Sequence, residues 1–370
     1  MSSVMFGPQT PAALVPPLNF VQREERMSRR SKLALIAVAV CAGLTAALSA
    51  TAAPTARKAS QTFGIVPAVA ANPAQQAIVI GFRNQAKKLG YQSAMFGGEF
   101  SPQAQITAVN AAIQRKVAVL AIWPLDPKSI RPTLDRARAA GIKILTMWTP
   151  SAIGQAANFQ YAEGPPAEKV AALAAAKIKA SGKECKVGIL QGLPVVPILK
   201  ARNIALAAGA KKAGCKILEQ QVNDKDSADG ALPIVQAWQT KWGGEMTGVL
   251  AYNDPSALGA IAARTGDFDP VVTGMNGDPA AIQAIKKGDM LATTTIPNPE
   301  MGNAMAYAGD QLLKGKKIPS LLLAKCDALT KADAAKYVPW PTRNKRALTV
   351  KFVKRGGSWY FTTTPDYGIK

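Results

Sequence analysis

The stretch VAVLAIWPLDPKSIRPTLDRARAAGIKILTM (117–147) decides the fold. It opens with the apolar run VAVLAI (117–122), which is short enough to be a buried strand. A helical segment over 134–140 follows and ends at Gly141, and IKILTM (142–147) is a second strand. Strand, helix and strand in this order predict two parallel strands joined by a right-handed helical crossover.

The same alternation extends toward both ends of the chain. Further strands are predicted at 63–66 and 94–96, and, after a restart of the pattern beyond residue 180, at 187–190, 217–219, 248–251 and 271–274, with helices between them. Two such sets in tandem predict an α/β fold of two doubly wound lobes with parallel sheets. Ligands bind such sheets at the carboxyl ends of the strands, so the residues that follow each strand are the candidates for function.

The composition argues against catalysis. The 370 residues include no histidine, which excludes an imidazole base or a histidine-ligated metal, and the four cysteines form no CxxC pair. No cofactor, metal site or catalytic residue is therefore predicted. The net charge of +22 invites a nucleic-acid partner, but the basic residues are dispersed and no recognition helix is evident, so none is expected.

The first sixty residues have the order of a secretory signal. Positive charge at Arg29, Arg30 and Lys32 precedes the apolar run LALIAVAV (33–40) and the small-residue pattern ATA (50–52). We expect 1–52 to be a signal peptide, with Met27 as the true start, and 53–61 to be a linker. The mature protein would then be periplasmic or otherwise extracytoplasmic, touching the membrane only through a transporter.

The segments after the strands resemble the periplasmic sugar-binding family typified by ribose-binding protein. Five segments carry the likeness in the family's order: Asn72-Pro73, WPLD (123–126), AYNDPSALGA (251–260), GMNGDP (274–279), and ATTT (292–295) continued by EMG (300–302) and LLKG (312–315). The resemblance covers about 62–330 and implies the type I fold, whose two lobes close over a ligand about three hinge crossovers.

The same resemblance implies domain boundaries. We expect crossovers near 161–163, 296–297 and 325–327. The predicted parts are an N-terminal lobe of 62–161 plus 297–325, a C-terminal lobe of 162–296 plus 326–340, and a basic C-terminal hairpin extension of 341–370. The extension would serve lobe packing or contact with a partner.

Departures from the family pattern suggest an altered cleft. Trp148 and Thr149 stand where the family has Asp-Arg, and Gln75 lies where it has a ring-clamping aromatic residue. The predicted ligand-binding residues are Asn72, Gln75, Trp123, Trp148, Thr149, Lys200, Lys225, Asn253, Asn276 and Ile296. Two carboxylate positions lose their charge, while the cation at Lys200 stays and Lys225 is an added one. This pattern predicts weak ribose binding, and a ligand with an apolar or planar face for Trp148 and a polar or acidic end near Lys200 and Asn253. The alternatives are that Trp148 only packs and that Lys225 is a solvated loop residue.

Two cysteines precede strands that are neighbours in the family topology. Cys185 and Cys215 could therefore form a disulfide, which an exported protein permits, leaving Cys326 unpaired. The alternative is two buried free thiols.

These observations predict an exported monomer that captures a small polar ligand, such as a sugar, a sugar acid or a small carboxylate. The resemblance implies delivery to an ABC transporter permease. Presentation of the ligand to a membrane sensor is the alternative. A ligand-sensing transcription regulator shares the two-lobed body, but it would start with a helix-turn-helix rather than a signal.

Overall fold

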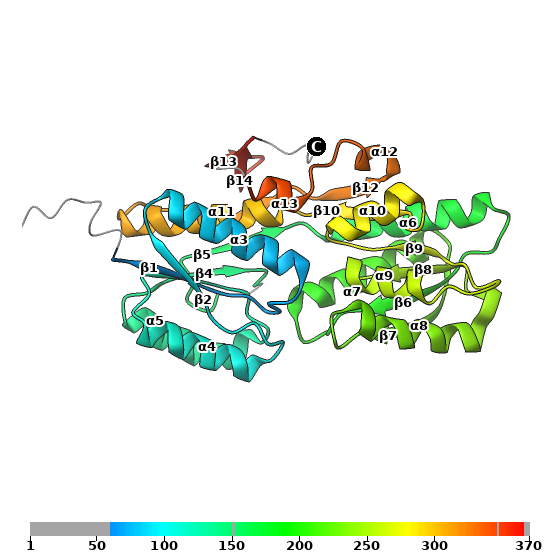
Figure 1. Cartoon of the computed structure of the whole chain (residues 1–370), viewed down its shortest axis with the longest axis horizontal. Helices are drawn as coiled ribbons and strands as arrows, with labels where there is room; N and C mark the ends of the chain where they lie inside the picture. Colours follow the sequence, from blue (N-terminus) through cyan, green and yellow to red (C-terminus); the bar gives the residue numbers. More distant parts are fainter. Residues whose placement is uncertain (1–59, 150–151, 346–347, 366–370) are drawn as a thin grey trace, which may run out of the picture. The chain divides into compact units, whose positions relative to one another are not determined.

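The computed structural model describes residues 60–149, 152–345 and 348–365. The predicted signal peptide and almost all of the linker lie outside these residues. Two mostly parallel sheets, each covered by helices, form the body of the chain, which is the α/β fold that the sequence predicts (Figure 1). No helix in the described part is long and apolar enough to cross a membrane.

The first sheet has eight strands in the order β13-β14-β11-β5-β4-β3-β1-β2. All neighbouring pairs are parallel except β13 and β14, which form an antiparallel hairpin. The strands are β1 (Thr62–Val66), β2 (Gln92–Met95), β3 (Val119–Ile122), β4 (Lys143–Met147), β5 (Ala157–Tyr161), β11 (Leu321–Ala324), β13 (Thr349–Arg355) and β14 (Ser358–Thr364).

Helices cover both faces of this sheet. In Figure 1, α3 (Pro73–Lys88) and α11 (Asn298–Leu313) lie on one face, and α4 (Pro102–Gln114) and α5 (Pro127–Ala139) on the other. The close packing of α3 against α11 depends on glycine, because a Cβ at Gly302 would lie 2.0 Å from the carbonyl oxygen of Ile78. The helix predicted at 134–140 in fact starts at Pro127, where the Asp126 side chain accepts hydrogen bonds from the first backbone N–H groups.

The second sheet has six strands in the order β12-β10-β9-β8-β6-β7, of which only β12 is antiparallel. Its two faces are covered separately: Leu250 of β8 belongs to one apolar cluster, and its neighbours Val249 and Ala251 belong to another. The strands are β6 (Lys186–Gln191), β7 (Lys216–Val222), β8 (Gly248–Ala251), β9 (Val271–Thr273), β10 (Ala292–Thr295) and β12 (Asp327–Thr330). The helices are α6 (Gly164–Ala180), α7 (Pro197–Lys212), α8 (Ala228–Trp242), α9 (Asp254–Ala262) and α10 (Pro279–Lys287), with a 3-10 turn, η1 (Gly243–Glu245), after α8.

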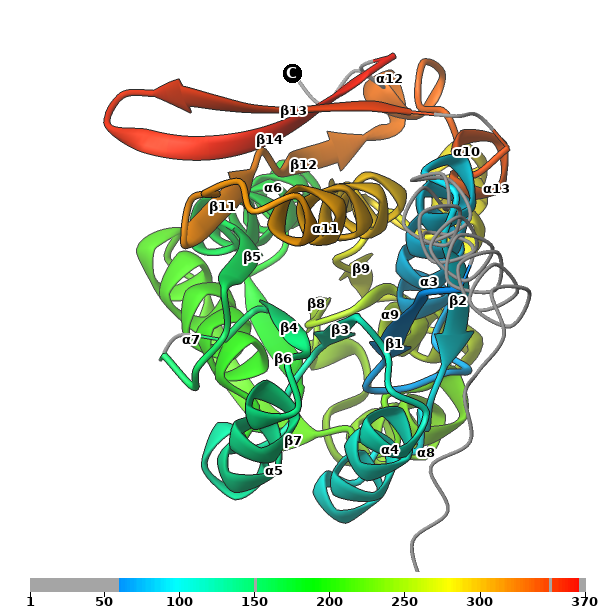
Figure 2. The same cartoon turned by 90° about the vertical axis from the view of Figure 1, so that its left-hand side faces the viewer.

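The chain passes between the two sheets at 162–163, 296–297 and 325–326. After β12 it returns once more to the first sheet, through α12 (Lys331–Ala334) and α13 (Trp340–Arg343), to reach β13. Figure 2 shows the β13–β14 hairpin alongside α11 and β11, and Leu323 of β11 pairs with Tyr360 of β14. The C-terminal segment thus adds two strands to the first sheet and a fourth connection to the three that the sequence predicts.

A disulfide joins Cys185 and Cys215, immediately before β6 and β7. These two strands are parallel neighbours, and Lys186 pairs with Lys216, so both sulfurs lie at the amino-terminal edge of the second sheet. Cys326 is a free thiol in the third connection. The disulfide therefore lies at the edge opposite the strand ends from which the candidate site is built.

Candidate ligand-binding site

A cavity of about 30 Å³ lies where the carboxyl ends of strands from both sheets face one another. It is lined from the first lobe by Asn72, Ala74, Gln75, Trp123, Trp148 and Tyr161, and from the second by Leu199, Arg202, Asp226, Tyr252, Asn253 and Asn276. This volume holds about two water molecules. The lobes must therefore separate, or the lining side chains must move, before a ligand of sugar size can enter.

An aromatic wall forms the first-lobe side of the cavity. Trp123 follows β3 and Trp148 follows β4, and their ring centroids lie 4.6 Å apart in an edge-to-face arrangement. Tyr161, at the end of β5, packs edge-on against Trp148 at 5.3 Å. The indole nitrogens of Trp123 and Trp148 are buried and lack an acceptor among the described residues. The wall can therefore offer apolar ring surface and two N–H donors to a ligand oxygen.

Arg202 is the cation of the site. It lies on α7 and donates from Nη1 to the Tyr252 carbonyl oxygen at 3.0 Å and to Asn276 Oδ1 at 2.9 Å. Its other nitrogens bind both carboxylate oxygens of Glu163, with an Nη2–Oε1 distance of 2.7 Å. Burial raises the pKa of the Glu163 carboxyl, and Arg202 opposes that rise. Glu163 belongs to the first connection between the sheets, so the pair joins a hinge segment to the cavity.

Asp226 holds the two sides of the cavity together. Its carboxylate accepts hydrogen bonds from Asn72 Nδ2 at 2.8 Å, from the Tyr252 hydroxyl at 2.5 Å and from Asn253 Nδ2 at 2.7 Å. Asn72 belongs to the first lobe, and the other two donors belong to the second. Burial raises the pKa of Asp226, while its hydrogen-bond donors lower it. A ligand hydroxyl could replace one of these donors and keep the carboxylate satisfied.

Backbone strain gathers around the same cavity. The non-glycine residues with positive φ include Trp148 at 53°, Asp226 at 53° and Asn276 at 135°. Left-handed backbone is costly for residues with a Cβ and clusters at binding sites, where it aims side chains that regular structure could not. This geometry turns the Asp226 carboxylate into the cavity while the preceding Lys225 stays exposed.

The structure brings Asn72, Gln75, Trp123, Trp148, Asn253 and Asn276 to the cavity wall. Two of them also cap helices: Asn72 accepts from the first N–H groups of α3, and Asn253 accepts from the Ser256 N–H of α9. The Gln75 Oε1 atom accepts from the Ala68 N–H. These three amide groups are fixed by the backbone, so they hold their remaining polar atoms in defined positions.

Four predicted residues lie elsewhere. Thr149 and Ile296 are buried but do not line the cavity, and the Thr149 hydroxyl donates to the Met147 carbonyl oxygen. Lys200 and Lys225 are exposed and are not among the residues that line this cavity, whose cation is Arg202. Lys200 and Arg202 are two residues apart on α7, so their side chains point about 200° apart around the helix axis.

Sequence reasoning missed the two charged lining residues. Arg202 stands two residues after Lys200 in LKAR (199–202), and Asp226 stands beside Lys225 in DKD (224–226). Hydropathy at helical spacing could not identify Arg202 as the buried residue of this segment, because α7 presents small apolar residues on several faces. With Glu163 behind Arg202, two carboxylates and one guanidinium surround the cavity. A negative excess at the cavity opposes an acidic ligand group and suits a ligand that donates hydroxyl hydrogen bonds.

A second pair of carboxyl groups is buried near the site in the second lobe. Asp254 accepts from the Thr293 hydroxyl at 2.6 Å and from the Asp278 backbone N–H at 2.7 Å. Burial raises the pKa of Asp254 to about 6, and burial together with the Asp254 charge raises that of Asp278. These groups position the loops before α9 and α10 and do not line the cavity. The described residues contain no group of three or more side chains suited to a metal ion.

Comparison with known proteins gives one consistent result. A family model described as a periplasmic binding protein domain matches residues 63–317. The ribose import binding protein of Bacillus subtilis is 26% identical over 265 residues, which are 71% of this chain and 85% of that protein. The xylitol-binding protein of Mycolicibacterium smegmatis is 25% identical over 237 residues, 61% of this chain and 65% of that protein.

Solved structures agree with the sequence relatives. A twin-arginine translocation pathway signal protein from Burkholderia phytofirmans matches with a TM-score of 0.68 and 26% identity, over 74% of this chain and 91% of that one. A periplasmic solute-binding protein of an ABC transporter from Actinobacillus succinogenes, with bound D-allose, matches with a TM-score of 0.65 and 22% identity, over 75% of this chain and 100% of that one. The family model ends at 317, so the segment that carries β11 to β14 lies beyond its match.

Proposed function

The chain belongs to the periplasmic binding protein family, and on that premise we propose that it is exported, captures a small neutral sugar or polyol between its lobes, and delivers it to an ABC transporter permease. It is a binding protein and not an enzyme, as its relatives are. The observation that carries the proposal is that one cavity is lined by Asp226, by Arg202 and by two indole N–H groups that have no acceptor among the described residues.

This arrangement suits a ligand rich in hydroxyl groups. A hydroxyl both donates and accepts, so it can give a hydrogen bond to Asp226 and receive one from an indole or from the Asn72 amide. Charge-assisted bonds of this kind are about twice as strong as neutral ones, and the rings provide a flat apolar surface for the C–H face of a sugar. A carboxylate ligand would instead face the excess negative charge of Asp226 and Glu163.

The connections between the sheets support capture by closure. Glu163 binds Arg202 from the first connection, and the Asn72–Asp226 bond links the lobes directly. The cavity is small when these contacts are made, so ligand entry and release require hinge movement. A permease could then distinguish loaded from unloaded protein by the relative placement of the lobes.

A ligand screen tests the proposal. The exported, processed protein is mixed with D-ribose, D-xylose, D-allose, D-arabinose or xylitol, and with D-gluconate as the acidic comparator. A neutral compound present at 100 times its Kd should add about 2.7 kcal/mol to the free energy of unfolding, seen as a higher melting temperature. Stabilisation by D-gluconate with no response to the neutral compounds would contradict the assignment.

A further inference from the structure

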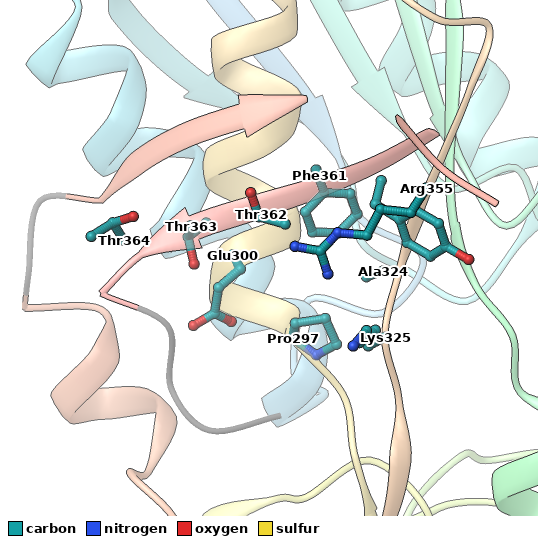
Figure 3. Close-up of a pocket in the computed structure, with 10 residues that line it drawn as sticks. Pro297, Glu300, Ala324, Lys325, Arg355, Phe361, Thr362, Thr363 and Thr364 are labelled. Atoms are coloured by element: carbon teal, nitrogen blue, oxygen red, sulfur yellow. The ribbon is translucent and has the colours of Figure 1, made fainter. Parts of the chain in front are cut away.

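A second and larger cavity lies outside the cleft, between the C-terminal hairpin and two of the connections between the sheets. Its volume is about 280 Å³, and its lining includes Pro297, Glu300, Lys325, Arg355, Tyr360 and Thr362 (Figure 3). Pro297 and Lys325 belong to the connections at 296–297 and 325–326, whereas Arg355 and Thr362 belong to β13 and β14. The cavity therefore joins hinge segments to a strand pair beyond the range of the family model.

The two cations of this cavity have no partner in the described part of the chain. Lys325 and Arg355 are exposed, and neither makes a hydrogen bond or an ion pair with a described residue. In Figure 3 the guanidinium group of Arg355 lies on the side of the hairpin strands, and Pro297 and Lys325 lie below it in the view. An arginine and a lysine that converge on one hollow offer an oxyanion both a forked donor and a point charge.

The carboxylate in the lining does not cancel this charge. Glu300 is buried, and Arg343 Nη1 lies 3.1 Å from each of its oxygens. Arg343 is fully buried and also donates to the Tyr337 hydroxyl at 3.0 Å. Since Glu300 is neutralised by Arg343, the lining keeps the positive charge of Lys325 and Arg355.

The size and walls of the cavity indicate an organic anion rather than a bare ion. Its volume is several times that of the interlobe cavity, and Tyr360 and Phe361 contribute ring surface beside the threonine side chains of β14. We propose that this cavity is a second binding site, for a small organic anion bearing a carboxylate or phosphate group, and that its occupancy is linked to the movement of the lobes.

The link between occupancy and lobe movement follows from the elements that form the cavity walls. The hairpin is fixed to the first sheet through β11, whereas Pro297 and Lys325 lie where the backbone must change direction when the lobes open. A ligand that contacts both sets of residues binds differently to the open and closed arrangements. Any such difference changes the affinity of the cleft for its sugar by the same factor.

Direct binding tests the site. The exported, processed protein is titrated with citrate or with inorganic phosphate by calorimetry, with ionic strength matched by chloride. Arg355→Gln should weaken the bound anion roughly tenfold, the effect of losing one charge-assisted hydrogen bond. Lys354→Gln is the matched control, because Lys354 is basic, exposed and adjacent but does not line the cavity, and it should change the Kd less than twofold.

The citrate and phosphate titrations distinguish the possible outcomes. Loss of citrate binding in Arg355→Gln alone supports a carboxylate site, and the same loss for phosphate alone supports a phosphate site. Equal losses in both variants would show diffuse attraction to a chain of net charge +22, and absence of binding by either anion would also overturn the site. Neither arm uses a sugar, so the result is independent of the proposed function.

The linkage has its own measurement. The Kd of the best-binding sugar from the screen is determined with and without saturating citrate or phosphate, whichever binds, in the wild type and in Arg355→Gln. A change of threefold or more that disappears in Arg355→Gln supports the link to the hinge. An unchanged sugar Kd, with the anion bound, would overturn that link.

Discussion

Replacement of Asp226 by asparagine tests the cleft most directly. The carboxylate accepts three hydrogen bonds, one from the first lobe and two from the second. Asparagine keeps the shape but removes the charge, and its amide nitrogen must face at least one of the three donors. If one charge-assisted hydrogen bond to the ligand is lost, the binding free energy falls by about 1.5–3 kcal/mol. The Kd of the bound sugar should therefore rise roughly 10- to 150-fold.

Calorimetry with the best-binding compound of the screen measures this change. Asp224→Asn is the matched control, because Asp224 lies in the same loop, is exposed and does not line the cavity, so its Kd should stay within twofold of the wild type. Circular dichroism melting of both variants checks that the fold is retained. A folded Asp226→Asn protein that binds the sugar within twofold of the wild type would refute the role of this carboxylate.

Three further variants test other parts of the structure. Trp123→Phe keeps an aromatic ring but removes an indole N–H that has no acceptor in the described part of the chain. We expect the binding free energy of the sugar to weaken by about 0.5–1.5 kcal/mol in calorimetry, and an unchanged Kd would exclude a hydrogen bond from this group to the ligand. Arg343→Met removes the buried ion pair that Arg343 makes with Glu300 and should lower the free energy of unfolding in urea by about 3–5 kcal/mol. Partial recovery is expected in the double variant that also carries Glu300→Gln, and no recovery would contradict the ion-pair explanation. Burial raises the pKa of Asp254 from 3.8 to about 6, so this carboxyl binds its proton more tightly in the folded state, and its contribution to stability is full below about pH 4 and is lost as the pH rises through 6. Asp254→Asn should remove about 2–3 kcal/mol of that decline, and curves of unfolding free energy against pH that run parallel in the variant and the wild type would argue against it.

The fold could be predicted because its inner strands are apolar on both faces. The four residues of β3 and of β8 are all buried, and such continuous runs are typical of parallel strands between helix layers. β5 (ANFQY) was not predicted, because its composition is mixed and it is set by pairing with β4 and β11. Local sequence thus identifies a buried central strand and misses a strand that tertiary pairing selects.

The site residues also divide into those that the local sequence indicates and those that depend on tertiary contacts. Trp123 and Trp148 directly follow strands and Asn253 comes two residues after one, so the sequence could indicate them, because the strand ends of an open sheet meet at one edge. Arg202 lies inside a helix and Asp226 in a loop with left-handed backbone, so their orientation depends on contacts with Glu163, Tyr252 and the opposite lobe. None of these contacts can be predicted from the local spacing of residues. The charges of the cleft were therefore assigned to the neighbouring lysines.

The total charge of the chain does not indicate the charge of the cleft, for a related reason. The value of +22 is a sum over the whole chain, whereas the cavity is governed by Arg202, Asp226 and Glu163, whose balance is negative. Exposed lysines such as Lys200 and Lys225 are screened by solvent and salt within about 8–10 Å, so they act weakly on a ligand enclosed between the lobes. Their field instead acts on what approaches from outside, including an anion at the second cavity beside the C-terminal hairpin. A neutral sugar inside and anionic partners outside are therefore compatible in one strongly basic protein.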